Sequence, residues 1–264
     1  MRKTAGAGVK IMKTKQELLE IIKDQLAIEY SCPAKDFSSP DNIITVSADN
    51  KNKRHYIDGT FFFQMATFGE NAVITADKSI HEWLGEYIKD KKGYWLFEHN
   101  HLMAIEGELI KYNKKLWTTH HMFLSARNTE PKGIDYKIKW FEENEVHQFY
   151  ETKLYPNALS KKYDPKRKDV LAVAAYDGDR IIGMAGCSAD TPLLWQVGID
   201  VNVNYRGKGI GTELVTLLKN ETENRGKIPF YGTSLSNLHS WGIALNSGFF
   251  PAWIEIATIE DHAI

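Results

Sequence analysis

The stretch Tyr205-Arg206-Gly207-Lys208-Gly209-Ile210-Gly211-Thr212 decides how the C-terminal half of this chain folds. The apolar run 193–201 before it is typical of a buried strand, and the segment 212–220 after it has the pattern of an amphipathic helix. Glycines let a backbone approach an anion closely, and the free N–H groups at the start of a helix point toward it. Arg206 and Lys208 add positive charge to the same turn. The stretch therefore predicts a phosphate-binding turn.

The spacing of the glycines separates this turn from two common nucleotide motifs. It lacks the G-x-x-x-x-G-K-[ST] spacing, and Tyr205 stands where G-x-G-x-x-G has its first glycine. Residues 206–211 instead match [Q/R]-x-x-G-x-[G/A]. That pattern resembles the acyl-CoA pyrophosphate loop of the GNAT acetyltransferase superfamily.

The flanking sequence extends the resemblance to roughly residues 134–258. The segment 237–249 is similar to the second GNAT signature, in which Asn237 opens a helix that ends before the pair Gly248-Phe249. Ser236 or Asn237 can cap that helix, and Gly248 can take the left-handed position after its end. Farther upstream, two apolar runs flank Asp177-Gly178-Asp179, which predicts a β-hairpin. The family has such a hairpin before its phosphate-binding strand.

The resemblance implies the fold class, the cosubstrate and most of the binding residues. We expect an α/β chain with a mixed sheet, and acetyl-CoA as the cosubstrate of a direct attack by an amine without a covalent intermediate. A splayed strand pair would offer main-chain groups to the thioester arm. The residues expected to bind acetyl-CoA are Ile199, Val201, Arg206, Gly207, Lys208, Gly209, Ile210, Gly211, Thr212 and Asn237.

The acid and base of the reaction are harder to assign. The family tyrosine that protonates the thiolate would fall at Ala244, so this chain departs from the common pattern. Tyr231 is a candidate substitute, and a packed strand aromatic is its alternative role. Asp200 and His239 are candidate bases, against the alternatives of a structural carboxylate and a solvent-facing histidine.

The rest of the chain predicts a second, smaller part. We expect a flexible tail over residues 1–13, an accessory α/β domain over 14–128, and the GNAT-like domain over 134–264, divided by the polar Pro/Gly segment 127–133. Thr14 should cap a first helix. The accessory domain either covers one side of the cleft or is a degenerate copy of the C-terminal half. Residues 139–154 read as a helix, and 93–98 as extended chain.

The composition of the chain limits the kinds of partner and the compartment that we expect. A net charge of −1 offers no field for nucleic acid or anionic membrane, and two distant cysteines suit a reducing, cytoplasmic compartment. The chain has no apolar run of membrane-spanning length. The pairs His99/His101 and His120/His121 lack zinc-site spacing, so no metal is expected.

Two functions follow as hypotheses. The first is an N-acetyltransferase acting on an amine of a small molecule or peptide, with a homodimer allowed. The alternative is a non-catalytic acyl-CoA-binding or sensing protein, which the alanine at position 244 favours.

Overall fold

The computed structural model describes residues 13–125, 128–152 and 154–260. Most of the tail expected over residues 1–13 lies outside these ranges. The α-helices are α1 (Lys15–Glu29), α2 (His81–Ile88), α3 (His99–Leu109), α4 (Glu143–Val146), α5 (Ile210–Asn224) and α6 (Leu238–Asn246). The strands are β1 (Ile43–Val46), β2 (Phe63–Thr67), β3 (Ala72–Ala76), β4 (Lys114–Leu116), β5 (His120–Ser125), β6 (Lys137–Glu142), β7 (Asp169–Asp177), β8 (Arg180–Ala189), β9 (Leu194–Val201), β10 (Ile228–Ser234) and β11 (Phe249–Glu260).

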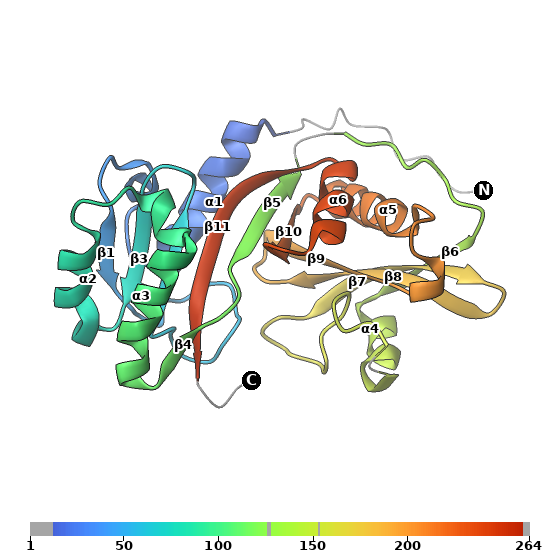
Figure 1. The fold of residues 1–264 in the computed structure, drawn as a ribbon. Helices are drawn as coiled ribbons and strands as arrows, with labels where there is room; N and C mark the ends of the chain where they lie inside the picture. The colour runs from blue at the N-terminus through green and yellow to red at the C-terminus, as the bar shows by residue number, and fades with distance from the viewer. Residues whose placement is uncertain (1–12, 126–127, 153, 261–264) are drawn as a thin grey trace.

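The described strands form one sheet in the order β1-β3-β2-β11-β5-β10-β9-β8-β7-β6, and β4 pairs with β11. Neighbours are antiparallel except for β1–β3 and β9–β10, which are parallel. A mixed sheet with helices on both faces confirms the predicted α/β class (Figure 1).

The sheet is continuous across the predicted division of the chain. Strand β5, from the first half, lies between β10 and β11 of the second half and is antiparallel to both. Strand β11 in turn pairs with β2 of the first half. The division at 127–133 stays a prediction, but the two parts share backbone hydrogen bonds along most of β11.

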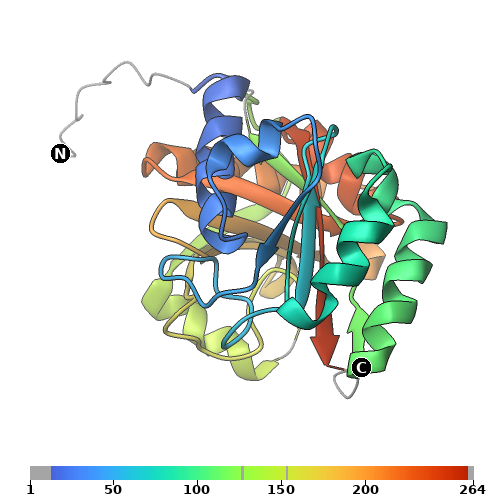
Figure 2. The ribbon, with the colours of Figure 1, turned by 90° about the vertical axis from the view of Figure 1, so that its left-hand side faces the viewer.

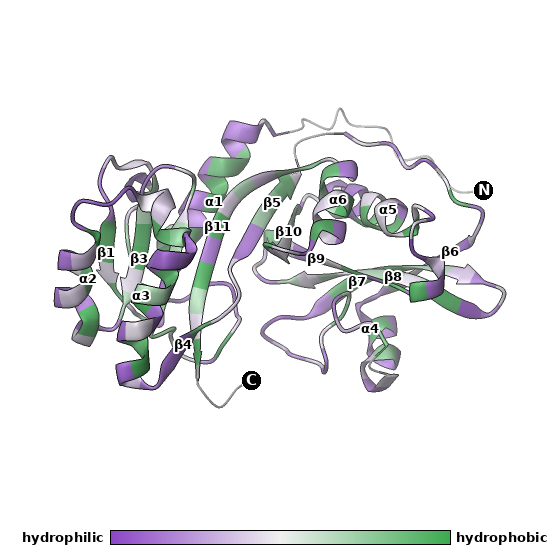
Figure 3. Cartoon of the chain, in the orientation of Figure 1, coloured by the Kyte–Doolittle hydropathy of each residue, from purple (hydrophilic) through white to green (hydrophobic). Residues whose placement is uncertain are grey.

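Helices cover the two ends of the sheet differently. Helix α1 packs on one face over β2, β3, β5, β9 and β10, whereas α2 and α3 pack on the other face over β2 and β3 (Figure 2). Helices α5 and α6 lie over β7 to β10, opposite α4. Strand β3 is buried along its whole length and is green in Figure 3, while α2 and α3 alternate apolar and polar residues, as helices with one solvent-facing side do.

Local signals in the sequence explain several of these boundaries. The Thr14 hydroxyl accepts from the N–H of Glu17 at 3.2 Å, and the Glu17 carboxylate accepts from the N–H of Thr14 at 2.6 Å, a capping box that confirms the predicted cap. The β7–β8 hairpin turns at Gly178, whose φ is +59°. Gly248 has φ +89° just after α6, as predicted.

Two predicted elements are wrong. Residues 137–142 form strand β6, paired with β7, and only residues 143–146 of the predicted 139–154 helix are α-helical. The spacing of the aromatic residues there is approximately helical, which is why a helix was predicted. In the structure Ile138 and Trp140, two residues apart, both point to the α5 side of the sheet, as side chains of a strand do. Residues 93–97 form a 3-10 helix, not extended chain; Gly93 allows it to lie directly against the backbone of Asn71 and Ala72.

Candidate functional site

The site forms where the parallel strands β9 and β10 separate. Their pairing ends at Val197 and Tyr231, although β9 continues to Val201 and β10 to Ser234. The main-chain groups of Gly198–Val201 that face β10 therefore have no ladder partner there. The predicted residues Ile199 and Val201 lie on this unpaired part of β9. Unpaired backbone beside a gap can bind an extended polar chain in the way a missing strand would.

A cleft of about 1070 Å³ runs along this gap. One end lies at the glycine turn 205–212 that precedes α5, and the cleft extends to β5 and to the loop 156–161. All predicted site residues line it except Lys208, whose ammonium lies 4.9 Å from the centre of the Tyr205 ring. The sequence-predicted phosphate turn and the strand gap thus belong to one cavity.

The glycine turn has the geometry of an anion site. Gly207 and Gly209 have φ values of +77° and +79°, which L side chains rarely adopt, and a Cβ on either would meet open space. Gly209 is the N-cap of α5, so the first N–H groups of that helix have no intrahelical partner. Arg206 lines the cleft, with its Nε 3.3 Å from the Val201 carbonyl oxygen to which it donates.

Gly211 has a packing role that the sequence does not reveal. A Cβ at this position would lie 2.9 Å from Cδ1 of Ile243, in the contact between α5 and α6. The φ of Gly211 is not in the left-handed region. Its small size therefore lets the two helices approach closely, in addition to any approach of a ligand.

Asp200 is bound to the loop that forms one wall of the cleft. Its carboxylate accepts hydrogen bonds from the N–H of Asn157 at 2.8 Å, the N–H of Ala158 at 2.8 Å and the Asn157 side-chain amide at 2.6 Å. The same loop lies so close to Gly198 that a Cβ there would overlap the Asn157 carbonyl oxygen. These contacts tie the end of β9 to the loop 156–161.

Tyr231 is the last residue of β10 that pairs with β9, so it lies where the gap begins. Its ring is 2% exposed and packs edge-on to Phe123, and its hydroxyl is 2.6 Å from the Ser240 hydroxyl on α6. Burial raises the pKa of Tyr231 above its ordinary value. One of the two hydroxyls donates to the other, so the pair keeps one O–H that can donate a hydrogen bond to a charge in the gap.

The start of α6 supplies the rim of the cleft. Asn237 caps the helix by accepting from the Ser240 N–H at 3.2 Å, so its predicted ligand contact competes with this cap. His239 is exposed on the first turn, beside the cleft. Ala244 is fully buried among apolar side chains. Because the residue is alanine, α6 has no phenol at the position of the family tyrosine.

Sequence reasoning missed the cleft residues on the other face of the sheet. Gln196, Arg167 and His120 line the cleft. Arg167 donates to Asp190 through Nε at 2.8 Å and to the Gln196 side chain through Nη2 at 2.6 Å. Strand alternation is the sequence signal that could have identified His120. It turns the two adjacent histidines of β5 toward opposite faces of the sheet, so only one of them can face this side of the cleft.

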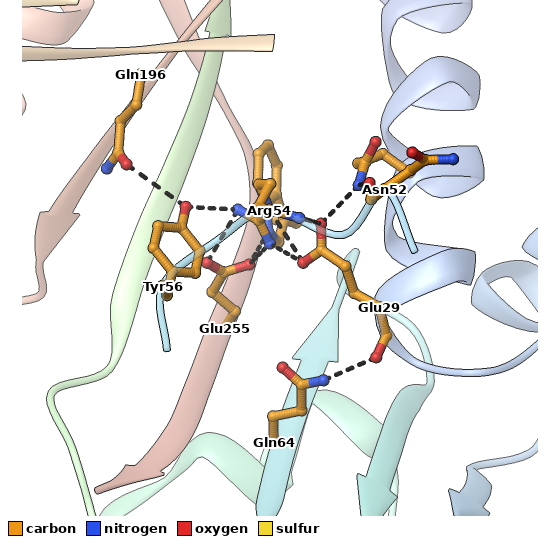
Figure 4. A network of polar contacts seen from close by, with 9 residues as sticks. Glu29, Asn52, Arg54, Tyr56, Gln64, Gln196 and Glu255 are labelled. Atoms are coloured by element: carbon orange, nitrogen blue, oxygen red, sulfur yellow. Dashed lines mark hydrogen bonds and ion pairs between the residues drawn. The ribbon is translucent and has the colours of Figure 1, made fainter. Parts of the chain in front are cut away.

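A buried charge network connects the first half of the chain to the cleft residue Gln196. Figure 4 shows Arg54 between Glu29 and Glu255, with nitrogen–oxygen distances of 2.8 Å to each. Tyr56 accepts from Arg54 at 3.1 Å and lies 3.5 Å from the Gln196 side-chain oxygen. Burial raises the pKa of Glu255, but the Arg54 guanidinium outweighs it and leaves that pKa below its ordinary value. The network holds the loop 47–62 against the cleft.

Neither a metal site nor a membrane span emerges from the described ranges. No group of three or more His, Cys, Asp or Glu side chains within them is arranged to hold a metal ion. No helix among them is long and apolar enough to cross a membrane.

A comparison with protein families agrees with this geometry. The Acetyltransferase (GNAT) family model matches residues 135–249, from β6 to the start of β11. A search of curated proteins gives no match.

Solved structures resemble the fold only in part. A GNAT-family protein from Novosphingobium aromaticivorans is 16% identical, with a TM-score of 0.44 over 55% of this chain and 66% of that one. A GCN5-related N-acetyltransferase-like protein from Streptococcus suis is 17% identical, with a TM-score of 0.42 over 61% and 69%. The yncA protein from Salmonella typhimurium, solved with acetyl-CoA, is 12% identical, with a TM-score of 0.34 over 48% and 95%.

The order of strand, glycine turn and helix, the gap beside β9 and the family match all fall within the same residues. The C-terminal half of the chain is a domain of the GNAT acetyltransferase family, a family that transfers acyl groups from acetyl-CoA.

Proposed function

We propose that this protein transfers the acetyl group of acetyl-CoA to a primary amine of a small molecule or peptide by direct attack. The observation that carries the proposal is the single cleft that joins the α5 turn to the gap between β9 and β10. The turn would bind the pyrophosphate, and the unpaired backbone of Ile199 and Val201 would bind the pantetheine arm. This arrangement leaves the thioester in the gap, beside Tyr231.

Leaving-group stabilisation falls to the hydroxyl pair in this proposal. A phenol with a raised pKa does not readily give its proton to a thiolate, whose thiol has a pKa of about 8.5. It can donate a hydrogen bond to the developing charge instead. Tyr231→Phe should lower kcat by at least about tenfold and leave acetyl-CoA affinity intact. A fully active Tyr231→Phe variant would leave Tyr231 only its packing role.

The test measures binding and turnover separately. Calorimetry gives the affinity for acetyl-CoA, and release of the coenzyme A thiol is followed over a panel of amines, amino acids and peptides. The protein's own cysteines should react only slowly with the thiol reagent of this assay. Burial raises the pKa of both Cys32 and Cys187 to about 12, so little of the reactive thiolate is present.

The sensing alternative has one observation in its favour, the alanine at position 244, which leaves α6 without a phenol. Tight binding of acetyl-CoA with no thiol release on any amine would favour that alternative. Thiol release that depends on the amine, with the acetylated amine identified by mass spectrometry, would support the transferase.

A further inference from the structure

We propose that His120, supplied by the first half of the chain, is the general base that deprotonates the amine. The inference deepens the proposed function and rests on it. Its first support is position. His120 is the first residue of β5 and pairs with Ser234, the last residue of β10, so only the end of β10 separates it from the gap where β9 and β10 are apart.

Register places His120 on the face opposite α5 and α6. Residues directly opposite each other in an antiparallel pair point to the same face, and side chains alternate along a strand. Leu124 of β5 packs with Phe230 and α1, and His120 is four residues before Leu124, so it lies on that same face. Gln196 pairs with Phe230 across the parallel β9–β10 ladder and lies on this face too.

The two ends of the cleft therefore lie on different faces of the sheet. The phosphate turn belongs to the α5 side, whereas His120, Gln196 and Arg167 line the cleft on the α1 side. A pantetheine arm that threads the gap from the α5 side brings its thioester toward the His120 side. An amine arriving from that side meets the carbonyl carbon with His120 beside it.

The environment leaves the His120 ring available. It is partly buried, lines the cleft and packs edge-on to Trp117 with 6.3 Å between ring centres. Within the described part of the chain, no hydrogen bond or ion pair engages its ring nitrogens. The charged groups on neighbouring elements include Glu255 on β11, opposite His120 in register, and Arg54, which Glu255 binds.

The other titratable groups of the cleft are less suited to this task. Asp200 already accepts three hydrogen bonds. Asp169 has a pKa raised by burial, but it lies level with Gln196, beside the part of β9 that still pairs with β10, and accepts from Ser160 at 2.9 Å. The whole of β8 separates its strand β7 from β9, whereas β5 is next to β10 at the other edge of the gap. His239 lies at the start of α6, on the phosphate side.

The step balances with the groups named. As the amine nitrogen bonds to the thioester carbon, His120 takes a proton from that nitrogen. The C–S bond breaks with its electron pair on sulfur, and the coenzyme A thiolate takes a proton from water while hydrogen-bonded by the Tyr231–Ser240 pair. His120 then returns its proton to water, which leaves the amide and the free thiol.

The chain contains a matched control in the next residue. His121 faces the other side of β5, where its ring packs against Trp241 with 4.7 Å between ring centres. His120→Gln should lower kcat by about 10²–10⁴-fold with unchanged acetyl-CoA affinity, which is the usual contribution of a general base. His121→Gln should keep the wild-type kcat. Added imidazole should restore part of the rate of His120→Ala.

The outcomes separate this inference from the proposed function. Equal kcat values for wild type and His120→Gln would overturn the role of His120 alone. A loss in His120→Ala that imidazole does not restore, at an unchanged melting temperature, would make His120 a positioning residue and overturn the inference as well. A wild type that binds acetyl-CoA but releases no thiol with any amine would overturn the proposed function itself.

Discussion

Removing the Asp200 carboxylate should loosen one wall of the cleft without removing a base. The Asp200→Ala variant loses three charge-assisted hydrogen bonds to Asn157 and Ala158. Such bonds contribute about 1.5–3 kcal/mol each when fully formed, but partial exposure of this site screens them. We expect a total of about 1–3 kcal/mol for opening of the loop, which corresponds to about 5- to 150-fold faster amide exchange at Asn157 and Ala158.

Asp200→Asn is the control that separates positioning from proton transfer. Its amide oxygen can accept from the two backbone N–H groups, and the Asn157 side chain can turn to present its own oxygen to the new NH₂. The loop should therefore stay protected in Asp200→Asn, and most of the activity should remain. If Asp200 were the base, both variants would lose about 10²–10⁴-fold in kcat. A large loss in Asp200→Asn with unchanged amide protection would refute the positioning role.

The structure predicts four further outcomes. Gly209→Ala places a side chain at φ +79°, which should destabilise the turn by about 1–3 kcal/mol, and a calorimetric acetyl-CoA affinity equal to wild type would contradict its role. Arg54→Met leaves Glu29 and Glu255 buried without their cation and should destabilise the chain by about 3–5 kcal/mol at pH 7 in denaturant titrations; unchanged stability would contradict the network. Because the folded pKa of Glu255 is lowered, its contribution is present above the ordinary glutamate pKa of about 4.3 and is lost as pH falls, so the cost of Arg54→Met should shrink below pH 4. An isolated segment 134–264 lacks β5 between β10 and β11 and should be insoluble; a soluble segment that binds acetyl-CoA would show that the C-terminal half folds alone.

The phosphate turn could be predicted because its conformation is set locally. Gly207 and Gly209 take left-handed backbone angles that few other residues tolerate, and Asn237 and Gly248 mark the ends of α6 by capping. Such signals depend on residues a few positions apart. They therefore identified the turn, the helix after the gap and the missing phenol at Ala244.

The acceptor side could not be predicted, because it depends on contacts between distant residues. Strand β5 inserts between β10 and β11, more than one hundred residues later in the chain, and only that pairing brings His120 to the gap. Likewise, the partner of Asp200 lies in the loop before β7, and the need for Gly198 comes from that same loop. Alternation along a strand puts His120 and Met122 on one face of β5, but the sequence does not say which face meets the cleft.

Hydrogen exchange on acetyl-CoA binding tests the central claim most directly. If acetyl-CoA occupies the gap between β9 and β10, it should slow exchange at the free N–H groups of Ile210, Gly211 and Thr212 and at the unpaired part of β9, residues 198–201. Amides of β1 and β3, which lie at the far edge of the sheet, should exchange as before. Protection confined to residues outside the α5 turn and the gap, at saturating acetyl-CoA, would contradict the account.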